Sequence, residues 1–129
     1  MKASAEERDI KELEFIADSI RRVRTWGATG RESLNDEVLG EAIDSRMRKI
    51  AESTQRLSAS LTSSEPNIPW VQISGFRNVM THDYHEIDRD RLWKVIAQDL
   101  PALGEAVERM LVRTKDKLQT TTRKNDLSR

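Results

Sequence analysis

The chain has 129 residues, no cysteine, and a formal net charge of zero from 22 basic and 22 acidic residues. This length suits one domain with a single core, and the lack of cysteine excludes disulfides, thiol nucleophiles and thiolate metal sites. The balanced charge excludes a protein that binds nucleic acid through a general basic excess, so any contact with RNA must be local.

No stretch of the sequence approaches the roughly 20 consecutive apolar residues that a membrane-spanning helix needs. The first residues, MKASAEERDI, are acidic and mixed in character, unlike a secretory signal peptide. We therefore expect a cytoplasmic protein that makes no use of a membrane.

Two amphipathic helices are predicted in the first half of the chain. Within residues 10–23, apolar side chains recur at intervals of three and four, which predicts a helix that ends at Gly27. The same spacing continues over residues 39–61, where it predicts a second, long helix. Ser33 or Asn35 is a suitable N-cap for it.

Prolines divide the second half of the chain into shorter elements. The segment SSEPNIP, residues 63–69, must break the helical pattern, which resumes from Trp70 to Met80. Asp88 is a suitable N-cap for a fourth, short helix, and Pro101 is expected to open a fifth helix rather than kink the fourth. The sequence therefore predicts an all-α bundle of four to five helices.

We expect the helical domain to cover residues 1–112. Residues 113–129 carry isolated leucines among charged and threonine side chains, so they are expected to form a charged tail that frays and adds nothing to the core. Basic side chains of this tail could touch phosphate weakly, although a solubilising role is the simpler interpretation.

The segment RNVMTHDY, Arg77–Tyr84, gathers polar side chains suited to RNA cleavage. The unperturbed pKa of histidine, about 6.5, lets His82 accept or donate a proton at neutral pH. When the 2′-hydroxyl of RNA attacks the adjacent phosphate, the guanidinium of Arg77 can stabilise the negative charge on the phosphoryl oxygens. Asn78 could orient His82 or a phosphate, and Tyr84 could position RNA by stacking or through its hydroxyl. This chemistry requires no metal and no other cofactor.

Helical spacing separates the two main candidates. Residues five apart lie about 140° around a helix, so Arg77 and His82 do not share a face, whereas Asn78 and His82 do. Arg77 and His82 can meet at one phosphate in three ways: the helix unwinds near His82, the arginine reaches around it, or two protomers combine their motifs.

These residues also have structural interpretations. Taken alone, a histidine near a helix end usually caps or packs, an arginine forms a surface ion pair, and a tyrosine is half-buried. His82 and His85 have a spacing that could suggest a metal, but no third ligand is defined, so no metal site is predicted. Trp26, Trp70 and Trp93 are predicted to be packing anchors rather than a platform for RNA bases.

Flanking residues complete a longer pattern around the motif. Arg77, His82 and Tyr84 form R-x4-H-x-Y, with NIPW before it and Ile87, Asp88, Trp93 and the stretch DLPAL after it. In this order the residues resemble the HepT-type proteins of the HEPN group, and the resemblance covers residues 9–111. One departure is the stretch IAES at residues 50–53, where many members of that family have glycine followed by Glu-Ala.

The resemblance implies a HEPN-type bundle and a metal-independent endoribonuclease that acts as the toxin of a toxin–antitoxin system. It also implies a symmetric homodimer whose interface unites Arg77 with His82. The implied partner is a minimal nucleotidyltransferase antitoxin that neutralises the toxin by transferring AMP to Tyr84, since the added phosphate would obstruct RNA. The alternatives are a non-catalytic helical subunit of a nucleotidyltransferase complex and a structural dimer fastened by the motif. The RNA target does not follow from the sequence.

Overall fold

The computed structural model describes the backbone of residues 3–82 and 86–127, together with their side chains except those of residues 77–88 and 127. Every regular element in these ranges is helical, which confirms the predicted all-α fold. None of the described helices is long and apolar enough to cross a membrane. In chain order the elements are α1 (Ala5–Trp26), the 3₁₀ turn η1 (Arg31–Asn35), α2 (Glu37–Gln55), α3 (Ala59–Ser63), α4 (Trp70–His82), α5 (Glu86–Lys94), the π-helical turn η2 (Val95–Asp99) and α6 (Leu100–Leu127).

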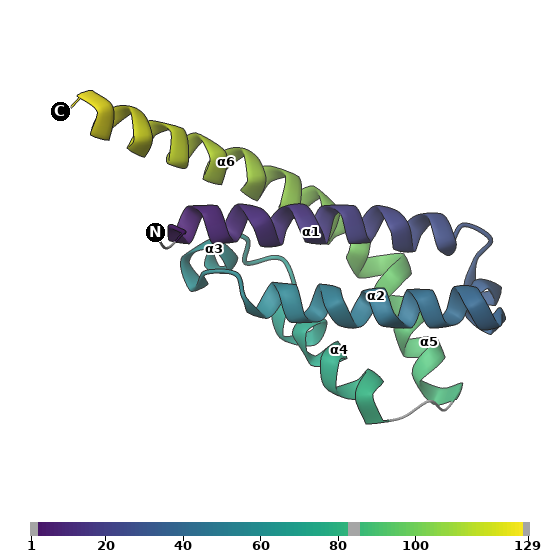
Figure 1. Ribbon diagram of the computed structural model, residues 1–129. Helices are drawn as coiled ribbons and strands as arrows, with labels where there is room; N and C mark the ends of the chain where they lie inside the picture. The colour runs from purple at the N-terminus through teal and green to yellow at the C-terminus, as the bar shows by residue number, and fades with distance from the viewer. Residues whose placement is uncertain (1–2, 83–85, 128–129) are drawn as a thin grey trace.

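The bundle is organised around two long antiparallel helices, α1 and α2, which lie side by side (Figure 1). α4 packs against α2, and α6 packs against α1, so each long helix has a second partner. The C-terminal end of α4 and the N-terminal end of α5 lie at the edge of the bundle away from α1 (Figure 1). This edge is therefore the part of the fold that carries the motif.

The N-terminal end of α2 is capped by Asp36, whose Oδ1 accepts a hydrogen bond from the Leu39 backbone N–H at 2.9 Å. The prediction that Ser33 or Asn35 caps this helix is wrong. Both lie in η1, where the Ser33 hydroxyl donates to the Gly30 carbonyl at 2.7 Å. Gly30 has a φ of 101°, a backbone conformation that favours glycine, and it fixes the start of this turn.

The second predicted helix is broken after Gln55, so the prediction of one helix over residues 39–61 is wrong. Asp9 of α1 is buried, and its carboxylate accepts hydrogen bonds from the Ser58 backbone N–H at 3.0 Å and from the Ser58 hydroxyl at 2.7 Å. A carboxylate bound to a backbone N–H caps a new helix, so α3 starts as a separate element. Leu57 remains buried across the break.

The predicted fourth and fifth helices follow one continuous helical path. α5 begins at Glu86, which places Asp88 inside the helix instead of at its N-cap. In η2 the Leu100 backbone N–H donates to the Val95 carbonyl, five residues back. Pro101 has no N–H to donate, and the wider turn accommodates the interrupted hydrogen-bond pattern. α6 begins at Leu100 with Pro101 in its first turn, as predicted, but it follows α5 through η2 instead of through a loop.

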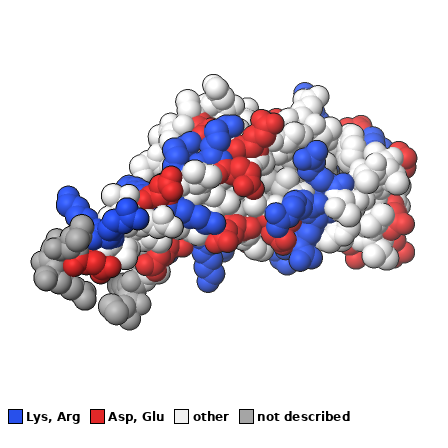
Figure 2. Space-filling view, turned by 90° about the horizontal axis from the view of Figure 1, so that it is seen from above, with Lys and Arg blue, Asp and Glu red and all other residues white. Residues whose placement is uncertain are grey.

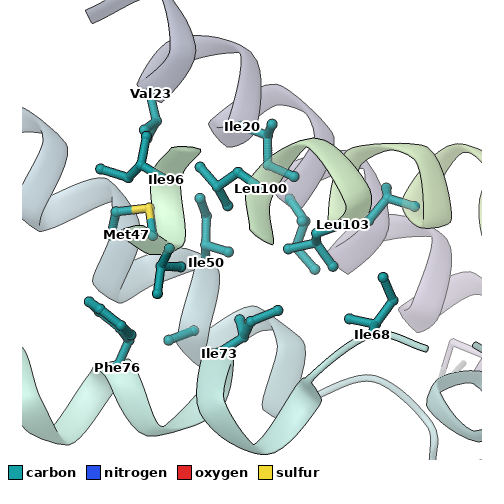
Figure 3. Close-up of a cluster of buried hydrophobic side chains, with 14 of the residues drawn as sticks. Ile20, Val23, Met47, Ile50, Ile68, Ile73, Phe76, Ile96, Leu100 and Leu103 are labelled. Carbon is teal, nitrogen blue, oxygen red and sulfur yellow. The ribbon is translucent and has the colours of Figure 1, made fainter. Parts of the chain in front are cut away.

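The core lies where α1, α2, α4 and the start of α6 meet (Figure 3). Each fully buried aliphatic side chain there contributes roughly 1.5–3 kcal/mol to folding. Trp26, Trp70 and Trp93 are partly buried and pack against this cluster, which confirms their prediction as packing anchors. The central side chains are Ile20, Val23, Met47, Ile50, Ile68, Ile73, Phe76, Ile96, Leu100 and Leu103.

The charged C-terminal stretch continues α6 as a regular helix to Leu127 and projects from the bundle (Figure 1). Its first turns still contact α1, because Thr114 is buried and the Lys117 Nζ lies 3.4 Å from the Glu6 Oε1. Beyond this contact, residues 119–126 are exposed. Where the sequence suggested a frayed tail, the chain forms a helix with a solvated outer half.

Candidate active site

The N-terminal end of α4 is fixed by the loop that precedes it. The Trp70 indole N–H donates to the Glu65 carbonyl at 3.0 Å, and the Trp70 backbone N–H donates to the Ile68 carbonyl at 2.9 Å. Ile68 and Ile73 are buried on either side of the helix start. The IPW segment therefore sets the position from which α4 extends toward the motif.

Glu65 anchors this loop to α6. Its side chain is 10% exposed, and its carboxylate oxygens lie 2.7 Å from the Arg109 Nη2 and 2.9 Å from the Arg113 Nη2. Hydrogen bonds from Arg109, and then from Arg113, lower the pKa of the Glu65 carboxyl below its usual range. Glu65 therefore remains ionised at neutral pH and has two cationic partners at the N-terminal end of α4.

α4 lies antiparallel on α2, and Ser74 fixes the register between them. The Ser74 hydroxyl lies 3.3 Å from the Thr54 Oγ1, and the Ser74 carbonyl accepts a hydrogen bond from the Gln55 Nε2 at 3.3 Å. Further along, Phe76 of α4 and Met47 of α2 belong to the same buried cluster (Figure 3). Advancing along α4 toward the motif thus corresponds to moving back along α2.

The predicted catalytic residues occupy the last turns of α4. Arg77, Asn78 and His82 all belong to the regular helix, whereas Tyr84 and His85 lie outside the described residues. Because the helix continues through His82, Arg77 and His82 are separated by about 140° around its axis. The backbone does not unwind before His82, which removes one of the three ways in which the pair was expected to meet.

α5 is fixed beside the start of α2 by two contacts to η1. The Arg89 Nη1 donates to the Asn35 Oδ1 at 3.0 Å, and the Arg31 Nη2 lies 2.6 Å from the Asp90 Oδ1. Both contacts join residues more than fifty positions apart in the sequence. They hold the first half of α5 against η1, next to the N-terminal end of α2.

Asp44 and Arg48 of α2 were missed by the sequence reasoning. Both are partly buried, and they lie one helical turn apart. Burial raises the pKa of the Asp44 carboxyl, and the positive charges of Arg48 and Arg89 offset part of that rise. The Arg48 Nε is buried and has no hydrogen-bond partner within the described part of the chain. The sequence signal that could have identified Arg48 is an arginine next to the row of apolar residues on α2.

Acidic and basic side chains are mixed on the face that Figure 2 shows, without a broad basic area on that face. This agrees with the zero net charge and with a local site for RNA. Among the described residues, no group of three or more His, Asp and Glu side chains is arranged to hold a metal ion. The face shown in Figure 2 therefore offers no broad basic area for RNA.

Similar proteins are named as ribonucleases. A relative from Methanocaldococcus jannaschii, named as an RNase, is 30% identical over 77 residues, which are 60% of this chain and 71% of the relative. A relative from Caldanaerobacter subterraneus subsp. tengcongensis, also named as an RNase, is 24% identical over 106 residues, 82% of this chain and 90% of the relative. One from Thermococcus cleftensis, named as a ribonuclease HepT, is 26% identical over 100 residues, 76% of this chain and 91% of the relative.

No solved structure matches the chain. The family described as "Ribonuclease HepT-like" matches residues 16–110. The matched segment contains half of α1, all of α2 and α4, and the whole R-x4-H-x-Y motif. Since the match covers well over half of the sequence, the chain belongs to the HepT-like family of ribonucleases.

Proposed function

We propose that this ribonuclease is a metal-independent endoribonuclease that uses Arg77 and His82, and that it acts as the toxin of a toxin–antitoxin system. The observation that carries the proposal is the R-x4-H pair on the last turns of α4, within the segment that matches the ribonuclease family. An intact acid–base residue and an intact cation favour cleavage over the alternative of a non-catalytic subunit.

In the proposed reaction His82 takes the proton of a ribose 2′-hydroxyl, and the 2′-oxygen attacks the adjacent phosphorus. The new P–O2′ bond forms as the P–O5′ bond breaks. The imidazole of His82, protonated in the first step, then supplies the proton that the leaving 5′-oxygen needs. The products are a 2′,3′-cyclic phosphate and a 5′-hydroxyl. Arg77 stabilises the charge that accumulates on the non-bridging oxygens, so the protein's own groups supply each step.

The regular helix favours a site composed from two protomers. Arg77 and His82 occupy positions about 140° apart around the axis of one α4, so two copies of the helix can bring the Arg77 of one chain to the His82 of the other. Asn78 shares a face with His82 and would orient its imidazole or a phosphate. We therefore propose a symmetric homodimer with two identical RNA-cleaving sites.

Mixing two inactive variants tests this arrangement. Arg77→Ala and His82→Ala are purified separately, and then unfolded and refolded together so that protomers exchange. If the pair acts between protomers, half of the dimers are mixed and each mixed dimer has one intact site, so about a quarter of wild-type cleavage should return. A pair acting within one chain gives no recovery. Sedimentation of an active monomer would contradict the dimer directly.

We further propose that a minimal nucleotidyltransferase antitoxin silences the enzyme by transferring AMP to the Tyr84 hydroxyl. A phosphodiester two residues after His82 adds bulk and negative charge where RNA must bind. Coexpression with a cognate nucleotidyltransferase should add mass in steps of one AMP to the peptide that contains Tyr84, and RNase activity should fall. Tyr84→Phe removes the acceptor oxygen and should escape the adduct. Silencing of the wild type without added mass would leave inhibition by binding alone.

A further inference from the structure

Arg48 is placed unlike the other arginines that lie at this end of the bundle. Arg89 donates to Asn35 at 3.0 Å, and Arg31 pairs with Asp90 at 2.6 Å, so both have partners. Arg48 is partly buried, and its Nε is shielded from solvent without a hydrogen-bond partner among the described residues. Leaving a buried N–H of a charged group without an acceptor costs free energy, which suggests that an acceptor arrives with a ligand.

The register of α2 against α4 places Arg48 beside the motif. Gln55 of α2 contacts Ser74 of α4, and the two helices are antiparallel. Arg48 precedes Gln55 by seven residues, about 10 Å along the helix axis. The same advance along α4 from Ser74 leads to Thr81, next to His82. Arg48 therefore lies level with the last turn of α4.

The electrostatic interaction of Arg89 on α5 with Asp44 also involves this part of α2. Arg48 and Arg89 both act on the Asp44 carboxyl, so Arg48 is near the first half of α5 as well as the end of α4. The carboxylates of α2 nearest to Arg48 along the helix are Asp44 and Glu52, each one turn away, and the exposed Glu41 lies two turns away. Asp44 makes no ion pair with Arg48 that is short enough to satisfy the guanidinium within the described residues. The Arg48 Nε thus remains a donor without an acceptor among the described residues, on the helix that packs against α4.

We propose that Arg48 binds an RNA phosphate next to the one that is cleaved, as a positioning residue of the site at the end of α4. This inference rests on the proposed function, because it assigns Arg48 to the same RNA. A guanidinium suits this role, since its forked donors bind two phosphate oxygens at once and it remains charged at every working pH. Arg48 takes no part in proton transfer.

Three substitutions on α2 test the proposal. Arg48→Met removes the charge and keeps an apolar stem, Arg48→Lys keeps the charge without the fork, and Lys49→Met removes a neighbouring exposed charge that faces the groove between α1 and α2. Each is measured on a mixed-sequence single-stranded RNA oligonucleotide. Binding is measured by fluorescence anisotropy with His82→Ala as the background, so that the RNA stays intact, and cleavage is measured with His82 present.

Arg48→Met should weaken RNA binding about tenfold and reduce the slope of log Kd against log salt concentration by about 0.7, as expected for one lost phosphate contact on a single strand. KM should rise by a similar factor while kcat changes less than about twofold. Arg48→Lys should recover part of the binding, and Lys49→Met should bind as the parent does. Because the Arg48 Nε has no hydrogen-bond partner among the described residues, and its charge only partly offsets the burial of Asp44, Arg48→Met should keep a melting temperature close to that of the parent.

Unchanged binding and an unchanged salt slope in Arg48→Met would overturn the proposal. So would equal losses in Lys49→Met, or a fall in melting temperature that accompanies the loss of binding, since these outcomes indicate general charge or a structural role. The proposed function fails in a different way. If wild type leaves the RNA uncut but Arg48→Met still binds it more weakly, the contact stands and the assignment of cleavage to Arg77 and His82 is wrong.

Discussion

Two groups of charged residues flank α4, one at each end, and they are built differently. At the N-terminal end the Glu65 carboxylate lies within 2.9 Å of nitrogens from both Arg109 and Arg113. Near the C-terminal end, Asp44 and Arg48 are partly buried on α2, and the Arg48 Nε has no hydrogen-bond partner within the described residues. The first group satisfies its charges inside the fold, and the second leaves a donor available.

From this difference we expect the N-terminal end of α4 to contribute to stability and the C-terminal end to contribute to the proposed RNA binding. Paired ions joining a loop to a helix far along the chain restrict the folded state, and removing one partner leaves the others unsatisfied. The Arg48 Nε has no acceptor among the described residues, so this donor is available to a ligand, although the charge of Arg48 also acts on Asp44. Substitutions at the two ends should therefore separate stability from activity.

The largest expected effect is at the C-terminal end. His82→Ala should reduce RNA cleavage by about 10²–10⁴-fold, the usual contribution of a general acid or base, and Arg77→Ala should reduce it to a comparable degree. Both variants should keep the helical content and melting temperature of the wild type. Cleavage of a single-stranded RNA and thermal unfolding followed by circular dichroism measure the two properties separately.

The same assay in excess EDTA is the control for the metal-independent mechanism, and the wild type should remain active. Loss of activity on chelation that a divalent cation restores would instead favour the H-x-x-H interpretation of His82 and His85. Unfolding of either alanine variant would assign Arg77 or His82 to the structure, and the contrast between the two ends of α4 would disappear.

At the N-terminal end, Glu65→Ala should lower the free energy of unfolding by about 1–2 kcal/mol, since it removes charge-assisted hydrogen bonds from two half-exposed arginines. Below its melting transition the variant should cleave RNA as the wild type does. Asp18→Ala is the matched control, because Asp18 also binds two arginines, Arg21 and Arg22, but at an exposed site of α1. Urea unfolding should show little change in that control.

The dependence of the unfolding free energy on pH in the acidic range tests Glu65 in a second way. The folded-state pKa of Glu65 lies below its usual value of 4.5, so its contribution is fully present above pH 4.5 and is lost as pH falls through the folded pKa. Glu65→Gln should therefore flatten the decline in unfolding free energy below about pH 4.5. An acid limb as steep as that of the wild type would show that other carboxyls carry this dependence.

The parts of this fold that could be predicted from the sequence depend on neighbouring residues, and the parts that could not depend on distant ones. Apolar spacing predicted α1 and α4, and Gly27 marked the end of α1. The break after Gln55 is set by Asp9, which lies 49 residues from its partner Ser58, and no local pattern reports that contact. Pro101 marked the first turn of α6, whereas the π-helical turn that joins α6 to α5 without a loop was not predicted.

The candidate site divides in the same way. Arg77 and His82 are predicted from the sequence because the motif is contiguous and its chemistry is specific. Arg48 has no such signal, since it is one of several arginines and lysines along α2. Its importance appears only when Gln55 is paired with Ser74 and Arg89 is brought near Asp44, and both relations are long-range. The sequence therefore predicts the motif residues of the proposed site but not the cation that α2 contributes to it.

The smallest expected effect, and the one with the opposite sign to Glu65, belongs to Asp44. Burial raises its folded-state pKa above the usual 3.8, so the ionised carboxyl destabilises the fold above that raised pKa, and the cost is relieved as pH falls through it. Asp44→Asn should therefore increase the unfolding free energy at neutral pH, by less than about 1 kcal/mol, and the gain should vanish in acid. Urea unfolding at neutral and acidic pH, with Glu65→Gln measured in parallel, compares the two ends of α4 directly. If Asp44→Asn destabilises the protein at neutral pH, the Asp44 carboxylate forms a stabilising charge pair with Arg48 in the free protein. That result would contradict the proposal that the guanidinium is available to bind RNA.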